Sequence, residues 1–266
     1  DLHSFPTRRS SDLWQRNERV LRARLEDAAF FWAEDRRKPL STNVERLKDV
    51  TYQEKLGSVY DKVEQTRKLA LLLCERLGRD SLAKLVERAA WLSKADLVTR
   101  MVYEFPELQG VMGREYARHD GEDPRVALAL YEQYLPRFAS DSLPTDDVGA
   151  ILGLAERIHI VVSCHKVGLE PTGSQDPYGL RRAARCINEI LWGRNLDLDL
   201  EEAVRESALL NQVEQDVLER ILAFIGQRLL VQLKEKGYEH ELAALALSVI
   251  GRRPCQASAK DRKSVV

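Results

Sequence analysis

The chain has 266 residues, with 41 Lys or Arg against 42 Asp or Glu, so its formal net charge is −1 at pH 7. This length fits one or two domains. The balanced charge argues against attraction of nucleic acid by the whole chain, so any RNA contact has to come from a local basic patch. No apolar run approaches the ~20 residues that span a bilayer, and no signal peptide is visible, so we expect a cytoplasmic protein without membrane contact.

Apolar residues recur every three or four positions through most of the chain, which predicts an all-α fold. The first predicted helix covers Trp14–Lys38, where Val20, Leu21 and Leu25 share an apolar face, and it ends before Pro39. No segment alternates over a strand's length. The other helices are predicted at Ser58–Leu77, Lys94–Phe105, Val126–Tyr134, Val148–Lys166, Tyr178–Gly193, Leu200–Leu210, Gln212–Gly237 and Glu239–Ile250.

Several helix starts are predicted from residues that favour the first turn. Asp80 or Ser81 is expected to cap the helix that follows Ser58–Leu77. Pro106 can itself begin a helix, because the missing N–H of a first-turn proline has no partner to lose. Thr145 is the expected cap before Val148, and Asp176–Pro177 reads as a cap followed by a first-turn proline.

The cysteines indicate a reducing environment. The four residues have no paired spacing, and three of them lie in apolar helical patterns, where cysteine behaves as a small buried side chain. They are Cys74, Cys164, Cys186 and Cys255.

The two ends of the chain read like translated adapter DNA. Phe5–Asp12 can be encoded by TTC CCT ACA CGA CGC TCT TCC GAT, and the complementary strand of the same DNA encodes Asp261–Val266 followed by a stop codon. We therefore expect residues 1–13 and 261–266 to be artefactual and exclude them from the fold. The remainder is expected to be an internal fragment of a longer subunit.

Five segments carry a family resemblance, because they follow one another in the same order and with similar spacing as in that family. Together they resemble the beta subunit of the bacterial two-subunit glycyl-tRNA synthetase, over roughly Trp14 to Ser258. The segments are Gln53–Val63, Lys94–Val102, Glu104–Ala117, Tyr134–Ala139 and Pro171–Ala184.

The resemblance implies two helical domains divided at the Gly-, Pro-, Thr- and Ser-rich linker Gly168–Asp176. Residues 14–170 would form a degenerate domain similar to the HD phosphohydrolases. Residues 176–258 would form a helical domain leading to a missing anticodon-binding domain.

The resemblance also implies the function. In this family the partner alpha subunit holds ATP, Mg and glycine and performs both chemical steps, while the beta subunit binds tRNA-Gly. We therefore expect a glycine–tRNA ligase subunit whose present fragment is non-catalytic and binds no cofactor or metal of its own. A helical interaction module without RNA function remains an alternative.

The HD-type metal site is expected to be degenerate. The HD fold binds a divalent metal, which activates water, through a first His, a His-Asp pair and a later Asp. In this sequence Gln53 lies near the position of the first His ligand. Lys94 and Asp96 lie where the His-Asp pair is expected, and the segment Ala155–His159 lies where the later Asp is expected. An HD-type metal-dependent phosphohydrolase is therefore the disfavoured alternative. Asp96, with Lys94 and Glu104, is interpreted as part of a helix-surface or interdomain salt bridge rather than a vestigial ligand.

The remaining histidines do not suggest a metal site. His119-Asp120 is the one literal His-Asp dipeptide, but Gly121 and Pro124 place it in a turn that we expect to be solvated. His159 and His165 lie six residues apart, about 600° around a helix, so one is expected to be buried and the other exposed.

Arg181, Arg182 and Arg185 are the best candidates for RNA contact. They lie near the start of a predicted helix, where free backbone N–H groups favour phosphate, and arginine suits bidentate phosphate contacts. An interdomain salt-bridge network is the alternative.

Gly110 and Gly113 interrupt another helical pattern, at a cost of ~1 kcal/mol each against Ala. Close helix packing is favoured for them over the approach of an RNA backbone.

Overall fold

The computed structural model describes residues 7–138, 140–239 and 254, with side chains from residue 14 onward. These residues form ten α-helices and one small hairpin, so the predicted all-α fold is confirmed. The strands are β1 (Thr51–Gln53) and β2 (Gly57–Ser58). The helices are α1 (Thr7–Asp35), α2 (Val59–Arg76), α3 (Ala83–Leu92), α4 (Arg100–Glu104), α5 (Val111–His119), α6 (Pro124–Glu132), α7 (Asp147–Lys166), α8 (Leu180–Gly193), α9 (Leu200–Leu210) and α10 (Gln215–Glu235).

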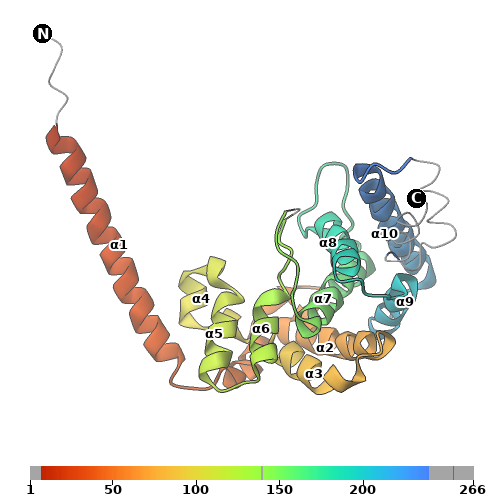
Figure 1. Cartoon of the computed structure of the whole chain (residues 1–266), viewed down its shortest axis with the longest axis horizontal. Helices are drawn as coiled ribbons and strands as arrows, with labels where there is room; N and C mark the ends of the chain where they lie inside the picture. Colours follow the sequence, from red (N-terminus) through yellow and green to blue (C-terminus); the bar gives the residue numbers. More distant parts are fainter. Residues whose placement is uncertain (1–6, 139, 240–253, 255–266) are drawn as a thin grey trace, which may run out of the picture.

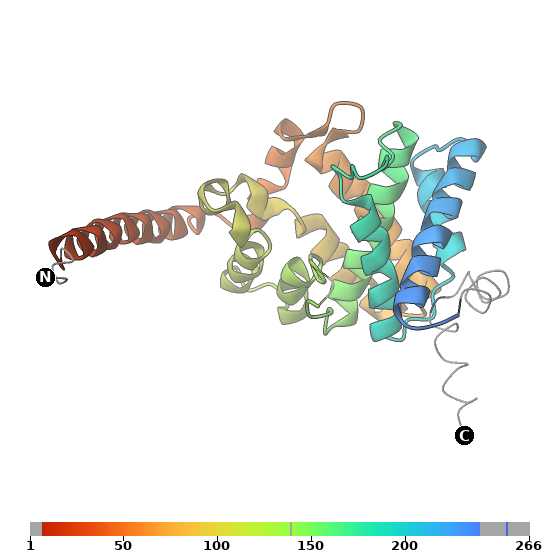
Figure 2. The same cartoon turned by 90° about the horizontal axis from the view of Figure 1, so that it is seen from above.

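Helix α7 is the centre of the fold. It packs against α2, α3 and α6 on one side and against α8, α9 and α10 on the other, and Figures 1 and 2 show it inside the body of the protein. Among the described residues it is the one helix that is long and apolar enough to cross a membrane, but nearly all of it is buried inside the protein. The expectation that no segment has this character is wrong for α7, because a core helix needs apolar residues on every face.

Helix α1 extends away from this body (Figures 1 and 2). Its C-terminal part packs through Trp32, whose ring stacks on Tyr116 at 5.3 Å between centroids. Further back, Val20, Leu21 and Leu25 are 55%, 61% and 72% exposed. The predicted helix is therefore confirmed, but its apolar face does not reach the core over these residues.

A capping box begins α2. The Ser58 side chain accepts a hydrogen bond from Asp61 N, and the Asp61 carboxylate accepts one from Ser58 N at 2.8 Å. The next predicted cap is wrong: residues Asp80–Leu82 form a 3-10 turn, and α3 begins after Leu82. Thr145 does not cap α7 either, since that role belongs to Asp146.

Helix α8 begins three residues later than Pro177. Gly179, in a left-handed conformation with φ +66°, precedes its first residue. This turn lets the Asp176 carboxylate accept hydrogen bonds from Leu180 N and Arg181 N at 2.8 and 3.0 Å. Asp176 thus satisfies two of the free N–H groups of the helix start, although Pro177 is not the first helical residue.

The predicted helix Lys94–Phe105 is interrupted. A 3-10 turn covers Ala95–Val98, and Thr99 then caps α4 through a hydrogen bond from Val102 N. Pro106 begins only a short 3-10 turn. The hairpin of β1 and β2 was not predicted, because strands of three and two residues are too short to alternate visibly.

One apolar cluster continues across the predicted linker. It joins Ile151 and Ile158 of α7 to Ile187 of α8 and Val204 of α9. The division into two domains near residues 170–176 stays a prediction. Apart from Glu239, which is described and not helical, the predicted helix Glu239–Ile250 lies outside the described residues. Cys255 and the end segment 261–266 also lie outside them, and the side chains of residues 7–13 are not described either.

Close packing accounts for both glycines before and within α5. A Cβ on Gly110, whose φ is +79°, would stand 2.6 Å from the Tyr134 ring and 3.1 Å from Leu130 O. A Cβ on Gly113 would stand 3.1 Å from the Asp96 carboxylate. The packing interpretation is therefore confirmed, and α5 approaches α6 closely because these positions carry no side chain.

Replacing Gly110 with Ala should destabilise the fold in two ways, by the backbone conformation and by the clash with Tyr134. Gly121→Ala is the matched control, because Gly121 has φ +78° and open space around its Cβ position. The control should lose about 1–2 kcal/mol of unfolding free energy, and Gly110→Ala about 1–3 kcal/mol more. Urea denaturation measures both, and equal losses would contradict the packing account.

Candidate functional site

A buried ion cluster lies where α2 and the segment before α4 meet α7. The Glu156 carboxylate accepts hydrogen bonds from Lys62 Nζ and Lys94 Nζ, each at 2.8 Å. Lys94 also donates to Gln133 Oε1 at 3.0 Å and to the Tyr134 hydroxyl at 2.9 Å. Lys94 and Glu156 are only 4% and 8% exposed. We call Lys62, Lys94 and Glu156 the ion cluster.

The cluster fixes the charge of its carboxylate. Burial by itself raises the pKa of Glu156, but the ammonium groups of Lys62 and Lys94 outweigh it and hold this pKa well below its usual range. Burial lowers the pKa of Lys94 to about 8, with the charge of Lys62 acting in the same direction and that of Glu156 against it. Near neutral pH the cluster therefore holds one negative charge between two positive ones.

The ion cluster occupies the positions at which the HD resemblance places metal ligands. Lys94 stands at the His position and Glu156 lies within the segment of the later Asp, while Gln53 lies on β1, where its Oε1 accepts a hydrogen bond from Lys55 N at 2.6 Å. The described residues contain no group of three or more His, Cys, Asp or Glu side chains placed to hold a metal ion. A carboxylate already paired with two ammonium groups is a poor ligand for a further cation.

Asp96 has a structural role that differs from the predicted salt bridge. It is 1% exposed, and its Oδ2 accepts hydrogen bonds from Gly110 N at 2.6 Å and Gly113 N at 3.1 Å. Burial raises the pKa of Asp96, against these donors and the charge of Lys94. The ion pair of Lys94 goes to Glu156 instead, so the expectation of a surface or interdomain salt bridge around Asp96 is wrong.

A second buried cation holds the loop after α6. Arg157 donates from Nη1 to Gln133 O and from Nη2 to the carbonyl oxygens of Tyr134, Leu135 and Pro136, at 2.8 to 3.2 Å. The peptide bond between Leu135 and Pro136 is cis. Adjacent residues of α7 thus hold two parts of this region: Glu156 binds Lys94, and Arg157 binds the loop after α6.

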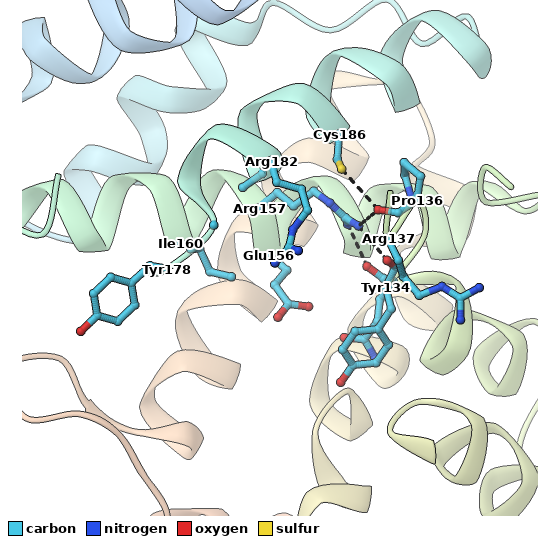
Figure 3. A pocket seen from close by; sticks show the side chains of 12 residues that line it. Tyr134, Pro136, Arg137, Glu156, Arg157, Ile160, Tyr178, Arg182 and Cys186 are labelled. Atoms are coloured by element: carbon cyan, nitrogen blue, oxygen red, sulfur yellow. Dashed lines mark hydrogen bonds between the residues drawn. The ribbon is translucent and has the colours of Figure 1, made fainter. Parts of the chain in front are cut away.

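A cavity of about 310 Å³ opens between this loop, α7 and the start of α8. We call it the α7–α8 pocket. Figure 3 shows Arg157 directed at the loop carbonyls, Arg182 reaching down from α8, and Tyr178 turned away from the other labelled side chains. Tyr178 is 41% exposed. Glu156 lines the same pocket, which therefore extends from the surface to the ion cluster.

The three predicted RNA-contacting arginines have different environments. Arg185 forms ion pairs with Glu189 at 2.9 Å and Glu235 at 2.8 Å. Both partners lie within residues 176–258, so these pairs are not the interdomain network of the alternative. Arg181 donates to the backbone carbonyl oxygens of Gln175 and Gly173.

Arg182 is the exposed member of the three. It makes no ion pair with a carboxylate in the described part of the chain, and its guanidinium lies close to Gly179, where a Cβ would stand 2.9 Å from Nη2. Arg182 is therefore the arginine whose charge is available at the mouth of the α7–α8 pocket.

Both histidines of α7 are buried, at 4% exposure for His159 and 2% for His165, so the prediction of one exposed histidine is wrong. Angular separation on a helix implies different environments only when one face meets water, and α7 is covered on all sides. His119 and Asp120 are exposed as predicted, but His119 is the last residue of α5 and only Asp120 lies in the turn. The Asp120 carboxylate also accepts a hydrogen bond from Leu40 N at 2.6 Å, which the sequence did not show.

The described cysteines agree with the prediction. Cys74, Cys164 and Cys186 are free and buried. Burial raises the pKa of each thiol, so all three are held in the unreactive protonated form.

Comparison with known proteins places the chain in a class of aminoacyl-tRNA synthetase subunits. The sequence model of the glycyl-tRNA synthetase beta subunit matches residues 5–248. The chain belongs to this family. The match begins inside the segment 1–13 that we expect to be artefactual, and the origin of that segment stays a prediction.

Several curated relatives carry the name glycine–tRNA ligase beta subunit. The protein of Syntrophomonas wolfei is 45% identical over 238 residues, covering 87% of this chain and 34% of the relative. That of Desulfitobacterium hafniense strain Y51 is 47% identical over 234 residues, covering 85% and 34%. That of Geobacter sp. strain M21 is 51% identical over 212 residues, covering 76% and 31%. The chain therefore spans about a third of the length of these relatives.

Removing the carboxylate of the ion cluster should be costly, because it leaves two buried ammonium groups without their counter-charge. We predict that Glu156→Gln lowers the unfolding free energy at pH 7 by about 3–5 kcal/mol. The folded-state pKa of Glu156 is depressed, so its stabilisation is present above the unfolded value of 4.5 and is lost as the pH falls below it. The unfolding free energy of the variant should therefore decrease less with falling pH, on the acid side, than that of the unaltered chain.

Denaturant titrations between pH 3 and pH 7 measure both effects. Glu87→Gln is the control, because Glu87 pairs with Arg67 at the surface and should contribute less than about 1 kcal/mol. A loss at Glu156 no larger than that of the control would show that the ion cluster does not stabilise the fold.

Proposed function

We propose that this chain is part of the beta subunit of a heterotetrameric glycine–tRNA ligase and contributes to binding tRNA-Gly. The partner alpha subunit carries out aminoacylation with ATP and Mg in the cytoplasm, and the present residues supply no catalytic group. The observation that carries the proposal is the family membership over residues 5–248, joined to an exposed, unpaired Arg182 at the mouth of the α7–α8 pocket.

The surroundings of Arg182 suit RNA. A guanidinium binds phosphate in a bidentate manner, and exposed aromatic rings stack on unpaired bases. Tyr178 and Arg182 both line the pocket, and Phe138, which is 57% exposed, follows Arg137 on the loop. Arg137 is paired with Asp141 at 2.7 Å, and the buried Arg157 is engaged by the loop carbonyls. Among the described residues that line the pocket, Arg182 is therefore the exposed arginine without an acidic partner.

The alternative of an HD-type phosphohydrolase finds no support in the site. Such an enzyme needs His and Asp side chains free to hold a metal, whereas Lys94 and Lys62 occupy the carboxylate of Glu156. An interaction module without RNA function is the remaining rival, and it predicts that tRNA does not bind.

The proposal is tested by measuring binding of the full chain to tRNA-Gly and to a non-cognate tRNA over a range of salt concentrations. If Arg182 contacts a phosphate, Arg182→Ala should weaken binding and reduce the slope of log K against log salt by about 1. Tyr178→Ala should weaken binding with little change in slope, because stacking releases no counterions.

Arg205→Ala is the matched control. Arg205 lies on α9, is similarly exposed and pairs with Glu201 four residues away, so its replacement should leave both affinity and slope unchanged. Absence of salt-dependent binding by the unaltered chain would favour the interaction module. Equal losses in Arg182→Ala and Arg205→Ala would remove the assignment to Arg182.

A further inference from the structure

A second cavity is lined by Lys62 of the ion cluster. It has a volume of about 240 Å³ and is formed by the turn of the hairpin, α2, the C-terminal half of α7 and the end of α9. Lys55, Lys62 and Lys166 line it together with His159, so each of three elements contributes a basic side chain. We call it the lysine pocket.

The charges around this cavity leave a positive excess. Lys55 and Lys166 are exposed and make no ion pair within the described part of the chain. Lys62 shares Glu156 with Lys94 in the ion cluster. Asp61 is the one acid among the described residues that line the cavity; its carboxylate accepts from Ser58 N and Ser58 Oγ at 2.8 and 2.7 Å and offsets one of the positive charges. Within the described part of the chain no carboxylate forms an ion pair with Lys55 or Lys166, so a positive excess remains.

Neutral donors supplement the lysines. Burial, together with the charge of Lys62, lowers the pKa of His159 to about 3, so the ring is uncharged at neutral pH. The Asn211 amide lies 3.5 Å from Nδ1 of this ring. Nδ1 accepts in this contact in the tautomer that carries its proton on Nε2. In that tautomer Nε2–H, which has no partner among the described residues, can donate to an occupant of the cavity.

We propose that the lysine pocket binds a small phosphate-bearing anion. Cavities for drug-sized ligands measure about 300–1,000 Å³, so about 240 Å³ suits phosphate, pyrophosphate or a small phosphate monoester. Ammonium groups bind phosphate as point charges from several directions. The site is separate from the α7–α8 pocket, and the proposal does not depend on tRNA binding.

The direct test is calorimetric titration of the full chain with inorganic phosphate and with pyrophosphate at constant ionic strength. Saturable binding to one site is expected, with a dissociation constant that rises at least about tenfold in the double variant Lys55→Gln/Lys166→Gln. Both lysines are exposed, so the variant should fold, and circular dichroism checks this. Lys68→Gln, an exposed α2 lysine outside the cavity, is the control and should bind as the unaltered chain does.

Thermal unfolding gives a second readout. Phosphate should raise the melting temperature of the unaltered chain and of Lys68→Gln, because binding to the folded state alone stabilises it, and should not raise that of the double variant. Heats that never saturate, or equal weakening in the double variant and in Lys68→Gln, would overturn the proposal. Preference for pyrophosphate over phosphate would identify a ligand with two phosphate groups within the same chemical class.

Discussion

A carboxylate taken out of water has to be paired, and the place of Glu156 inside α7 imposes this requirement on the rest of the fold. Lys62 reaches it from α2 and Lys94 from the turn before α4. Lys94 in turn holds Gln133 and Tyr134 at the end of α6. Elements far apart in the sequence are thereby tied to the central helix at one point, and each of the two cavities is lined by a residue of the ion cluster.

The same cluster is poorly suited to holding a divalent cation, because the Glu156 carboxylate is already paired with the ammonium groups of Lys62 and Lys94. The groups available to partners lie outward: Arg182 at the α7–α8 pocket, and Lys55 with Lys166 at the lysine pocket. Each suits phosphate, as nucleic acid in one case and as a small anion in the other.

Local patterns in the sequence predicted what depends on near neighbours. The helical spacing of α2 is an example, and Gly110 was correctly interpreted as a site of close packing. Lys94 and Glu156 are 62 residues apart in the sequence, so no local sequence pattern predicts that they form an ion pair. His165 was predicted less well because the apolar residues on every face of α7, visible in the sequence, were not taken to mean burial on all sides. The exposed residues of α1 have the spacing of a core face, which shows that periodicity indicates a helix without identifying its partner.

The central claim is that Glu156 and Lys94 stabilise the fold as a pair rather than separately. A double-mutant cycle with Lys94→Met, Glu156→Met and the double variant, followed by chemical denaturation at pH 7, tests it most directly. The account predicts that each single change costs about 3–5 kcal/mol and that the double variant loses much less than their sum, because methionine on both sides leaves fewer unpaired charges. Additive losses, within about 0.5 kcal/mol, would contradict it.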